Sequence, residues 1–377
     1  METNADCWGS EESDIARYFA KAAQSRTPLS ASFELTRRCN FRCVHCYLGD
    51  QESIHQHRGR ELDTKAVFRL LEEMTAAGTL FLTLTGGDPM IRPDFQAVYR
   101  RAVELGLLVT VFCNGTLITD EIACTFAQYP PRIVEITLYG ATQSTFEAVT
   151  QRPGSFAACM AGIERLRLAK VRLRLKTMVM SLNAHEFQAI RRLAVDMDLQ
   201  FRHDCSIHAA VPNDDNGGRS NTGGSLLDTL HFRLAPEQAA AADMSVEPLA
   251  AKLRELAQSA EERKPSGKLH RCGAGSSSYH VSPYGQMQPC LIVPTCSADI
   301  CAEGIQAGWS GPLQEFADHP ASASFLCGRC ENKKTCTACP AVLALNTGSP
   351  EQVDAFYCQY AEQRRQQNAR CDLRIER

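Results

Sequence analysis

Residues 34–47 read Glu34-Leu35-Thr36-Arg37-Arg38-Cys39-Asn40-Phe41-Arg42-Cys43-Val44-His45-Cys46-Tyr47. Three cysteines of this stretch, Cys39, Cys43 and Cys46, stand at i, i+4 and i+7, directly after the apolar, β-prone run 31–35. A strand formed by that run would deliver them to a loop at its carboxyl end. Enzymes built from βα units keep their reacting groups at that end of the strands, so the stretch predicts both a site and the fold that carries it.

The number of thiols in this loop has a chemical meaning. A 4Fe-4S cluster takes four thiolate ligands, so a loop that offers three leaves one iron free to bind another molecule. Zinc prefers a closed set of four ligands, usually from paired C-x2-C knuckles. Because the chain has 18 cysteines, the spacing alone does not decide between these metals.

The stretch resembles the C-x3-C-x2-C signature of the radical S-adenosylmethionine (SAM) enzymes, including the aromatic Tyr47 after the last cysteine. The resemblance implies that Cys39, Cys43 and Cys46 hold a 4Fe-4S cluster whose open iron chelates SAM. It also implies reductive cleavage of SAM to a 5'-deoxyadenosyl radical, which takes hydrogen from a substrate.

The pattern of residues 31–208 alternates between strands and helices. Apolar strand candidates lie at 32–36, 80–85, 107–112, 133–138, 172–180 and 199–207, and amphipathic helices are expected at 63–76, 93–105, 119–128, 155–168 and 184–196. Six βα units in series predict an α/β fold, either a parallel barrel or a doubly wound sheet. The resemblance implies the former, a partial (β/α)6 TIM-like barrel followed by a small C-terminal iron-sulfur domain.

Composition and resemblance together divide the chain into five parts. We expect an N-terminal extension (1–30), the barrel (31–211), a loop and helical linker (212–267), a cluster-binding domain (268–363) and a C-terminal tail (364–377). The linker contains the Gly/Asn/Ser/Asp-rich segment 212–225 and a helical stretch at 236–263. Ten of the 18 cysteines follow residue 270, as expected of a small domain held together by metal.

Polar motifs follow the ends of three further strands. After the second strand, Gly86 and Gly87 would let the backbone approach a ligand, and Asp88 would accept from a cationic amino group. The motif resembles the Gly-Gly-Glu that holds the methionine amino group in radical SAM enzymes, with Asp in place of Glu.

The third and fourth strands end in Asn114 and in Thr137-Leu138-Tyr139-Gly140. Both motifs would face the same mouth of the barrel as cofactor contacts. The second resembles the ribose-contact motif Ser-Leu-Asp-Gly of the family. Arg152 lies where the family usually has an arginine, and would pair with the methionine carboxylate.

The C-terminal cysteines form a second pattern, which resembles the SPASM auxiliary-cluster domain of peptide-modifying radical SAM enzymes. The resemblance implies two auxiliary 4Fe-4S clusters, one on Cys327, Cys330, Cys336 and Cys358, and one on Cys272, Cys290 and Cys339. It departs at Cys336-x2-Cys339, which is one residue short. The fourth ligand of the second set would be Cys296 or Cys301, or the position would be open to substrate; from spacing alone, structural zinc knuckles are the alternative.

The remaining cysteines are interpreted mainly as small buried hydrophobes: Cys7, Cys113, Cys124, Cys159, Cys205 and Cys371. Candidate catalytic residues are Tyr139 and the three that end the sixth strand, His203, Asp204 and Cys205. A structural role for His203, or for the nearby His208, is an equally good interpretation.

Net charge and hydropathy exclude several classes of protein. With a formal net charge of -3 and mixed signs, the chain has no basic footprint for nucleic acid or for an anionic membrane. The polar, acidic residues 1–14 are not a signal or transit peptide, and the apolar runs are too short to span a bilayer. We therefore expect a cytoplasmic protein whose clustered cysteines bind metal.

Three functions are weighed. The first is maturation of a peptide or protein by a thioether bond, a carbon-carbon crosslink or an oxidation. Its partners would be the precursor, an electron donor such as flavodoxin or ferredoxin, and a separate leader-recognition protein, because the roughly 30 residues before the first strand are too few for a winged-helix domain. The second is a radical SAM enzyme acting on a small molecule in cofactor biosynthesis, against which the seven downstream cysteines argue. The third is a non-enzymatic iron-sulfur carrier or scaffold, which leaves Gly86-Gly87-Asp88 unexplained.

Overall fold

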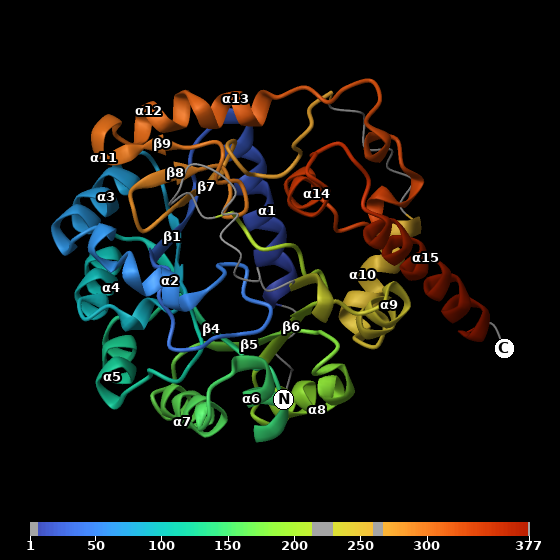
Figure 1. Cartoon of the computed structure of the whole chain (residues 1–377), viewed down its shortest axis with the longest axis horizontal. Coiled ribbons are helices and arrows are strands. Elements are labelled where there is room, and N and C mark those ends of the chain that lie inside the picture. The colour runs from blue at the N-terminus through green and yellow to red at the C-terminus, as the bar shows by residue number, and fades with distance from the viewer. Residues whose placement is uncertain (1–6, 213–228, 259–266, 376–377) are drawn as a thin grey trace.

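The computed structural model describes residues 7–212, 229–258 and 267–375. One nine-stranded sheet organises these residues, in the order β6-β5-β4-β3-β2-β1-β7-β8-β9. Strands β1 to β6 are parallel and curve into an open barrel, with helices α3 to α8 around its outside (Figure 1). The expected partial (β/α)6 barrel is therefore confirmed.

The barrel strands lie close to the expected positions. They are β1 (Ser30–Thr36), β2 (Phe81–Gly86), β3 (Leu108–Cys113), β4 (Ile133–Thr137), β5 (Leu173–Met178) and β6 (Gln200–Asp204). The covering helices are α3 (Thr64–Ala76), α4 (Phe95–Glu104), α5 (Asp120–Gln128), α6 (Gln143–Thr150), α7 (Ser155–Leu168) and α8 (Phe187–Asp196). Of these helices, α6 was not expected.

The side chains of each strand alternate between two environments. Outward-facing residues such as Phe33, Leu84 and Leu175 are buried in one core with α3, α4 and α7. The inward-facing residues of β5, Arg174 and Lys176, are polar and partly exposed, and they alternate with the buried Leu173 and Leu175. The stability of the barrel therefore comes from its outer layer, and its inner wall carries polar groups.

Three of the covering helices begin at side-chain caps. Asp63 accepts a hydrogen bond from the backbone N–H of Ala66 at the start of α3, and Thr119 and Thr142 cap α5 and α6 in the same way. Helix α6 is followed by its C-cap residue Gln151, whose φ of 53° is left-handed. These caps set where each helix begins, and therefore where the loops over the mouth end.

The C-terminal region extends the sheet beyond β1. Strand β7 (Ser278–Val281) pairs in parallel with β1, and β8 (Gln286–Gln288) and β9 (Ala298–Asp299) follow antiparallel. Tyr279, Met287 and Trp309 join the core of the barrel. The boundary expected at residue 268 therefore does not divide the core, and the division into domains stays a prediction.

The other helices lie outside the six βα units of the barrel. They are α1 (Cys7–Ser25), α2 (Gln51–Gln56), α9 (Pro236–Met244), α10 (Glu247–Gln258), α11 (Ile300–Glu303), α12 (Ile305–Ser310), α13 (Pro312–Asp318), α14 (Pro340–Thr347) and α15 (Ala355–Ile375). The expected extension thus contains α1, the helical stretch at 236–263 is split in two, and α15 crosses the boundary expected at residue 364. Segments 213–228 and 259–266 of the expected linker lie outside the described residues.

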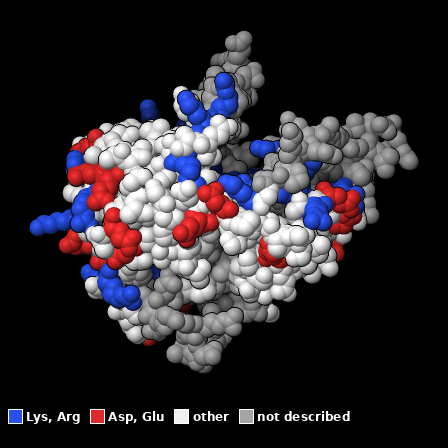
Figure 2. Space-filling view, turned by 90° about the horizontal axis from the view of Figure 1, so that it is seen from above, with Lys and Arg blue, Asp and Glu red and all other residues white. Residues whose placement is uncertain are grey.

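The surface carries charges of both signs. Lys and Arg are interspersed with Asp and Glu on the face shown in Figure 2. No helix of the described ranges is long and apolar enough to cross a bilayer.

Candidate cofactor site and cysteine clusters

The cysteine-bearing loop follows β1 and is fixed at both ends. The N–H groups of Arg42 and Val44 donate to the carbonyl oxygens of Thr150 (3.0 Å) and Val149 (3.1 Å), the last residues of α6. The N–H of Val211 donates to the carbonyl of Tyr47 (2.9 Å). Helix α6 therefore holds the loop against the mouth of the barrel.

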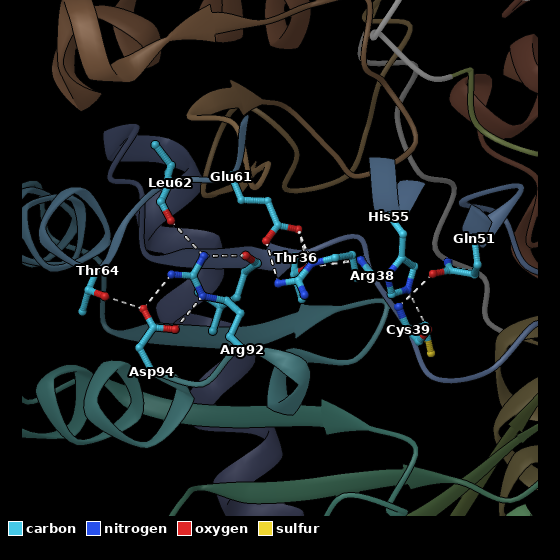
Figure 3. Close-up of polar contacts among 11 residues, drawn as sticks. Thr36, Arg38, Cys39, Gln51, His55, Glu61, Leu62, Thr64, Arg92 and Asp94 are labelled. Atoms are coloured by element: carbon cyan, nitrogen blue, oxygen red, sulfur yellow. Dashed lines mark hydrogen bonds and ion pairs between the residues drawn. The ribbon is translucent and has the colours of Figure 1, made fainter. Parts of the chain in front are cut away.

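Side chains of α2 hold the first cysteine (Figure 3). The N–H of Cys39 donates to Oε1 of Gln51 (2.7 Å), and Nε2 of Gln51 donates to the carbonyl of Arg37 (3.3 Å). Nε2 of His55 lies 3.3 Å from the carbonyl oxygen of Cys39. The buried side chain of Gln51 thus provides hydrogen-bond partners for two backbone groups, the N–H of Cys39 and the carbonyl of Arg37, that would otherwise lack them.

A buried ion pair fixes the point where β1 becomes the loop. Nη2 of Arg38 lies 2.9 Å from Oε2 of Glu61, and the hydroxyl of Thr36 also donates to Glu61 (Figure 3). Nearby, Arg92 pairs with Asp94 (2.7 Å) and donates to the carbonyl of Leu35 (3.2 Å). These contacts hold the backbone that leads to Cys39 in place.

The three thiols of the loop lie close enough to affect one another. Burial raises the pKa of Cys43 well above its usual value, and the neighbouring Cys46 and Cys39 raise it further. Burial raises the pKa of Cys39 to about 12, and the charge of Asp88 contributes. Because a metal cation would reverse this cost, the donor set fits a metal centre.

The residues after β2 lie beside Cys39. Asp88 is fully buried, and its two carboxylate oxygens accept from the N–H groups of Met90 (3.0 Å) and Asn114 (2.8 Å). Burial raises the pKa of Asp88 to about 6, although both hydrogen bonds lower it. A cationic group placed nearby would stabilise the carboxylate.

The two glycines before Asp88 serve the backbone of the protein itself. A Cβ on Gly87 would lie 2.4 Å from the carbonyl oxygen of Arg38, and one on Gly86 would lie 2.2 Å from that of Thr36. Their small size thus lets β2 pass the start of the cysteine loop. The expected close approach of a ligand to these glycines stays a prediction.

Asn114 joins β3 to the cysteine loop. Its Nδ2 donates to Oδ1 of Asn40 (2.7 Å) and lies 3.8 Å from Sγ of Cys39. Its Oδ1 accepts from the N–H (2.9 Å) and the hydroxyl (2.6 Å) of Thr116. The structure therefore brings Asn114 to the expected mouth, with its side chain engaged by the protein.

Tyr139 lies among the three thiols. Burial raises its pKa well above the usual value, the charges of Cys43, Cys46 and Cys39 add to this, and a hydrogen bond with Thr137 opposes it. Its ring meets that of His45 edge-on, with centroids 5.0 Å apart. Sequence reasoning missed His45, whose buried Nδ1 has no hydrogen-bond partner among the described residues and whose pKa burial lowers to about 4.

Arg152 lies at the outer side of the loop. It is exposed and lines a pocket of about 350 Å³ together with Cys39, Arg42, Gln51 and His55. Cys39 therefore lies next to a pocket that is open to solvent.

The candidates at the end of β6 do not face the mouth together. Nε2 of His203 lies 2.9 Å from Oδ1 of Asp243 in α9, and the second oxygen of Asp243 accepts from Tyr360 (2.5 Å) and Arg364 (2.7 Å) of α15. Cys205 lies on the same outer face, 4.0 Å from Oδ1 of Asp243. His203, Cys205 and Asp243 could geometrically hold a metal ion, but the Arg364 cation already occupies that carboxylate. His203 and Cys205 therefore join the barrel to α9 and α15.

Two other residues at the end of β6 have different positions. Asp204 accepts from the N–H of Ser206 (2.7 Å). His208 lies under the cysteine loop, with its ring centroid 6.3 Å from that of Tyr47.

The C-terminal cysteines surround one pocket of about 270 Å³. All seven expected ligands line it: Cys272, Cys290, Cys327, Cys330, Cys336, Cys339 and Cys358. Burial raises the pKa of Cys327, and the neighbouring Cys358, Cys336 and Cys330 raise it further. Burial also raises the pKa of Cys290, to which Cys272 and Cys339 contribute. The thiols thus fall into a group of four and a group of three.

The remaining cysteines lie elsewhere. Sγ of Cys296 donates to the carbonyl of Pro312 (3.3 Å), and Cys301 lies beside Arg69 of α3, so neither lines the pocket. Cys113 and Cys159 are buried in the core as expected, whereas Cys124 is exposed. Cys7 and Cys371 have no described side chains.

Comparisons with known proteins agree with this geometry. Residues 33–194 match the family model described as the Radical SAM superfamily. The AdoMet-dependent heme synthase of Methanosarcina barkeri is 26% identical over 347 residues, which cover 90% of this chain and 98% of that protein. The antilisterial bacteriocin subtilosin biosynthesis protein AlbA of Bacillus subtilis is 26% identical over 270 residues, 71% of this chain and 56% of that protein.

Among solved structures, SuiB of Streptococcus suis bound to its precursor peptide SuiA is similar with a TM-score of 0.66. The similarity covers 91% of this chain and 80% of that one, at 14% sequence identity. It shows that the two chains share a fold.

Proposed function

The chain belongs to the radical SAM superfamily and binds SAM, and from this premise we propose that it is an enzyme of cofactor biosynthesis that acts on a haem-related tetrapyrrole. The observation that carries the reaction type is the meeting of Cys39, Cys43 and Cys46 beside Asp88 and Tyr139. The observation that carries the substrate class is a similarity to a heme synthase along nearly the whole of both chains.

The residues of the mouth are proposed to act as follows. Cys39, Cys43 and Cys46 would hold a 4Fe-4S cluster with one open iron. When bound, this cluster supplies one electron to the SAM sulfonium, which releases methionine and the 5'-deoxyadenosyl radical that takes hydrogen from substrate. Asp88 would face the methionine amino group, since a cation stabilises its buried carboxylate.

Three further residues would orient SAM. Asn114 holds the cysteine loop against β3 and would set the distance between cofactor and cluster. Thr137 and Tyr139 would contact the ribose. Arg152, on the side of Cys39 that borders solvent, would pair with the methionine carboxylate.

Residues 268–363 are proposed to be the auxiliary-cluster domain. Cys327, Cys330, Cys336 and Cys358 offer a complete set of four thiolates. Cys272, Cys290 and Cys339 offer three, and the positions of Cys296 and Cys301 argue against either as the fourth. With the cluster at the mouth, the enzyme would carry three 4Fe-4S clusters and take electrons from a flavodoxin or a ferredoxin.

Peptide maturation is the second candidate. It was the first hypothesis from the sequence, and the similarity to AlbA, a bacteriocin biosynthesis protein, supports it over 71% of the chain. The heme synthase match covers more of both chains, and for that reason we place the tetrapyrrole first. The carrier or scaffold hypothesis is set aside because the chain is a radical SAM enzyme.

Iron content and SAM cleavage test the proposal. We expect about 12 iron per chain after anaerobic reconstitution, and about 8 in a Cys39/Cys43/Cys46→Ala variant. Dithionite-reduced wild type should release 5'-deoxyadenosine faster with iron coproporphyrin III and change the mass of that porphyrin. The triple variant should do neither.

Two outcomes would contradict separate parts of the proposal. About 4 iron per chain, with zinc in the remaining sites, would show that the assignment of two auxiliary iron-sulfur clusters is wrong. Twelve iron, with no effect of the porphyrin on deoxyadenosine release, would show that the tetrapyrrole is wrong and would move the peptide candidate to first place.

A further inference from the structure

The inner wall of the barrel carries a cluster of three cations around one carboxylate. Nη1 of Arg174 lies 3.1 Å from Oε1 of Glu135, Nη2 of Arg202 lies 2.6 Å from Oε2, and Nζ of Lys176 lies 3.8 Å from Oε2. The four residues come from the adjacent strands β4, β5 and β6. The group therefore has a formal charge of +2.

This excess of charge is not needed to satisfy Glu135. One bidentate arginine neutralises a carboxylate, and two further cations add mutual repulsion. Burial lowers the pKa of Lys176 to about 7, the charge of Glu135 opposes this shift, and the charges of Arg202 and Arg174 add to it. An arrangement that costs free energy in the unliganded protein suits a site that is completed by an anion.

The cations are only partly covered by the protein. The side chains of Arg174, Lys176 and Arg202 are 30%, 19% and 46% exposed, whereas that of Glu135 is 5% exposed. Nε and Nη2 of Arg202 both donate to Glu135, and Cζ lies 5.6 Å from the ring centroid of Phe112, but its Nη1 makes no hydrogen bond with the described residues. Arg202 thus has donors left for a second acceptor.

The cluster lies below the proposed cofactor contacts. Glu135 precedes Thr137 by two residues on β4, a rise of about 7 Å along a strand. Nζ of Lys176 lies 3.4 Å from the ring centroid of Phe112, which leads directly to Cys113 and Asn114. A molecule held by the cations would therefore reach from the inner wall toward the mouth.

We propose that Arg174 and Arg202, with Lys176, bind carboxylate side chains of the substrate and so orient its reacting carbon beneath SAM. The proposal rests on the proposed function, in which the substrate is a tetrapyrrole that carries several carboxylates. Arg202 would donate to one carboxylate through its remaining N–H groups. Arg174, whose Nε and Nη2 donate to Oε1 of Gln200 (3.2 and 3.0 Å), would donate to a second carboxylate by exchanging that neutral partner for an anion, so the two arginines would fix a rigid macrocycle at two points. They are positioning and specificity residues, and hydrogen abstraction takes place elsewhere.

Binding without turnover tests the proposal. Reconstituted enzyme, without reductant, is titrated with iron coproporphyrin III and followed by the porphyrin absorbance. We expect Arg174→Gln and Arg202→Gln each to weaken binding about 10- to 100-fold, as loss of a charge-assisted contact does. Arg202→Lys should recover part of the loss. Arg165→Gln, which removes an exposed arginine from α7, should bind as wild type does.

Glu135→Gln separates ligand binding from a structural ion pair. If the cluster only stabilises the barrel, loss of Glu135 and loss of an arginine should both weaken binding and lower the melting temperature. If the cations bind substrate, Glu135→Gln should leave the affinity unchanged or increase it, because it removes the competing carboxylate. Melting temperature and iron content of every variant show whether it folds. If a glutamine variant does not fold, Arg202→Lys still tests whether the arginine binds substrate.

Three outcomes would overturn the inference. Equal porphyrin affinity of wild type and both arginine variants would overturn it while leaving the proposed function intact. An equal loss of SAM affinity in the variants, measured by equilibrium dialysis, would assign the cations to the cofactor. Wild type that does not bind the porphyrin would overturn both the inference and the tetrapyrrole assignment.

Discussion

Gly87 has no room for a side chain. A Cβ there would lie 2.4 Å from the carbonyl oxygen of Arg38 and 2.5 Å from that of Arg37, and both atoms are backbone. We expect Gly87→Ala to lower the free energy of unfolding by about 1 to 3 kcal/mol, because one strand must move away from the cysteine loop. Urea denaturation of the wild type and the variant measures this.

Gly59 provides the matched control. A Cβ at Gly59 meets nothing within 4 Å, so Gly59→Ala should change the stability by less than about 0.5 kcal/mol. If both alanine variants were equally stable, the inferred close contact between Gly87 and the backbone of the cysteine loop would be wrong.

Lys176 predicts a pH dependence of stability. Burial lowers its pKa to about 7 in the folded protein, whereas an unfolded lysine titrates near pH 10.4. Between these values the unfolded chain binds more protons, so this lysine makes the folded state more stable as the pH rises, by up to about 1.4 kcal/mol per unit. The stability of wild type minus that of Lys176→Met should therefore increase from pH 7 to pH 10.

The exposed Lys65 gives the comparison. Lys65→Met, measured over the same range, shows how far removal of an exposed ammonium alone changes the stability. If the two lysine variants gave the same pH dependence, the ammonium of Lys176 would not be destabilised by the barrel wall.

At the scale of elements, α2 is a support for the cysteine loop. Gln51→Leu would leave the N–H of Cys39 and the carbonyl of Arg37 buried without partners, at about 1 to 3 kcal/mol each. We expect iron after reconstitution to fall from about 12 toward about 8, because only the loop at the mouth loses its support. The exposed Gln56→Leu, on the same helix, should keep the wild-type content. Equal loss at both positions would mean that α2 acts only through its general stability.

The sequence predicted the elements whose signal is local. The apolar runs that form β1 to β6 and the periodic helices such as α7 were found, because burial repeats within a few residues. Helix α6 was missed, since its eight residues, QSTFEAVT, are rich in weak helix formers and it forms by packing on the cysteine loop. Strand β7 was missed because its four residues pair with β1, far earlier in the chain.

The same distinction applies to the site. Cys39, Cys43, Cys46 and Asp88 could be found because each lies in a short motif. The cluster of Glu135, Arg174, Lys176 and Arg202 could not, because its members come from three strands and none belongs to a motif. His203 was predicted because it lies at a strand end. Alternate side chains of a strand face opposite sides, and that of His203 lies on the outer side of β6, away from the inner wall.

At the scale of the whole molecule, Asp243 couples the barrel to the C-terminal helix. Its side chain and that of Arg364 are 3% and 6% exposed, so Asp243→Ala would leave a buried, unpaired guanidinium. We expect a loss of about 3 to 5 kcal/mol, and a thermal transition that separates into two steps as α15 leaves the barrel.

A second variant checks the cause. Asp243→Leu combined with Arg364→Met should be more stable than Asp243→Ala alone, since it removes the orphan charge together with its partner. A single, unshifted transition in Asp243→Ala would show that α15 is held by apolar contacts and not by this network.

The pairing of β7 with β1 also has a consequence for synthesis on the ribosome. Residues 278–281 emerge roughly 240 residues after β1, so at 5 to 20 residues per second the nascent β1 waits roughly 12 to 50 s for its second neighbour. During that time its outer edge offers unpaired N–H and C=O groups to any other extended chain. The cysteines beside it are also available to the machinery that delivers iron and sulfide. Translation speed across residues 37–281 thus sets how long this edge of β1 stays unpaired.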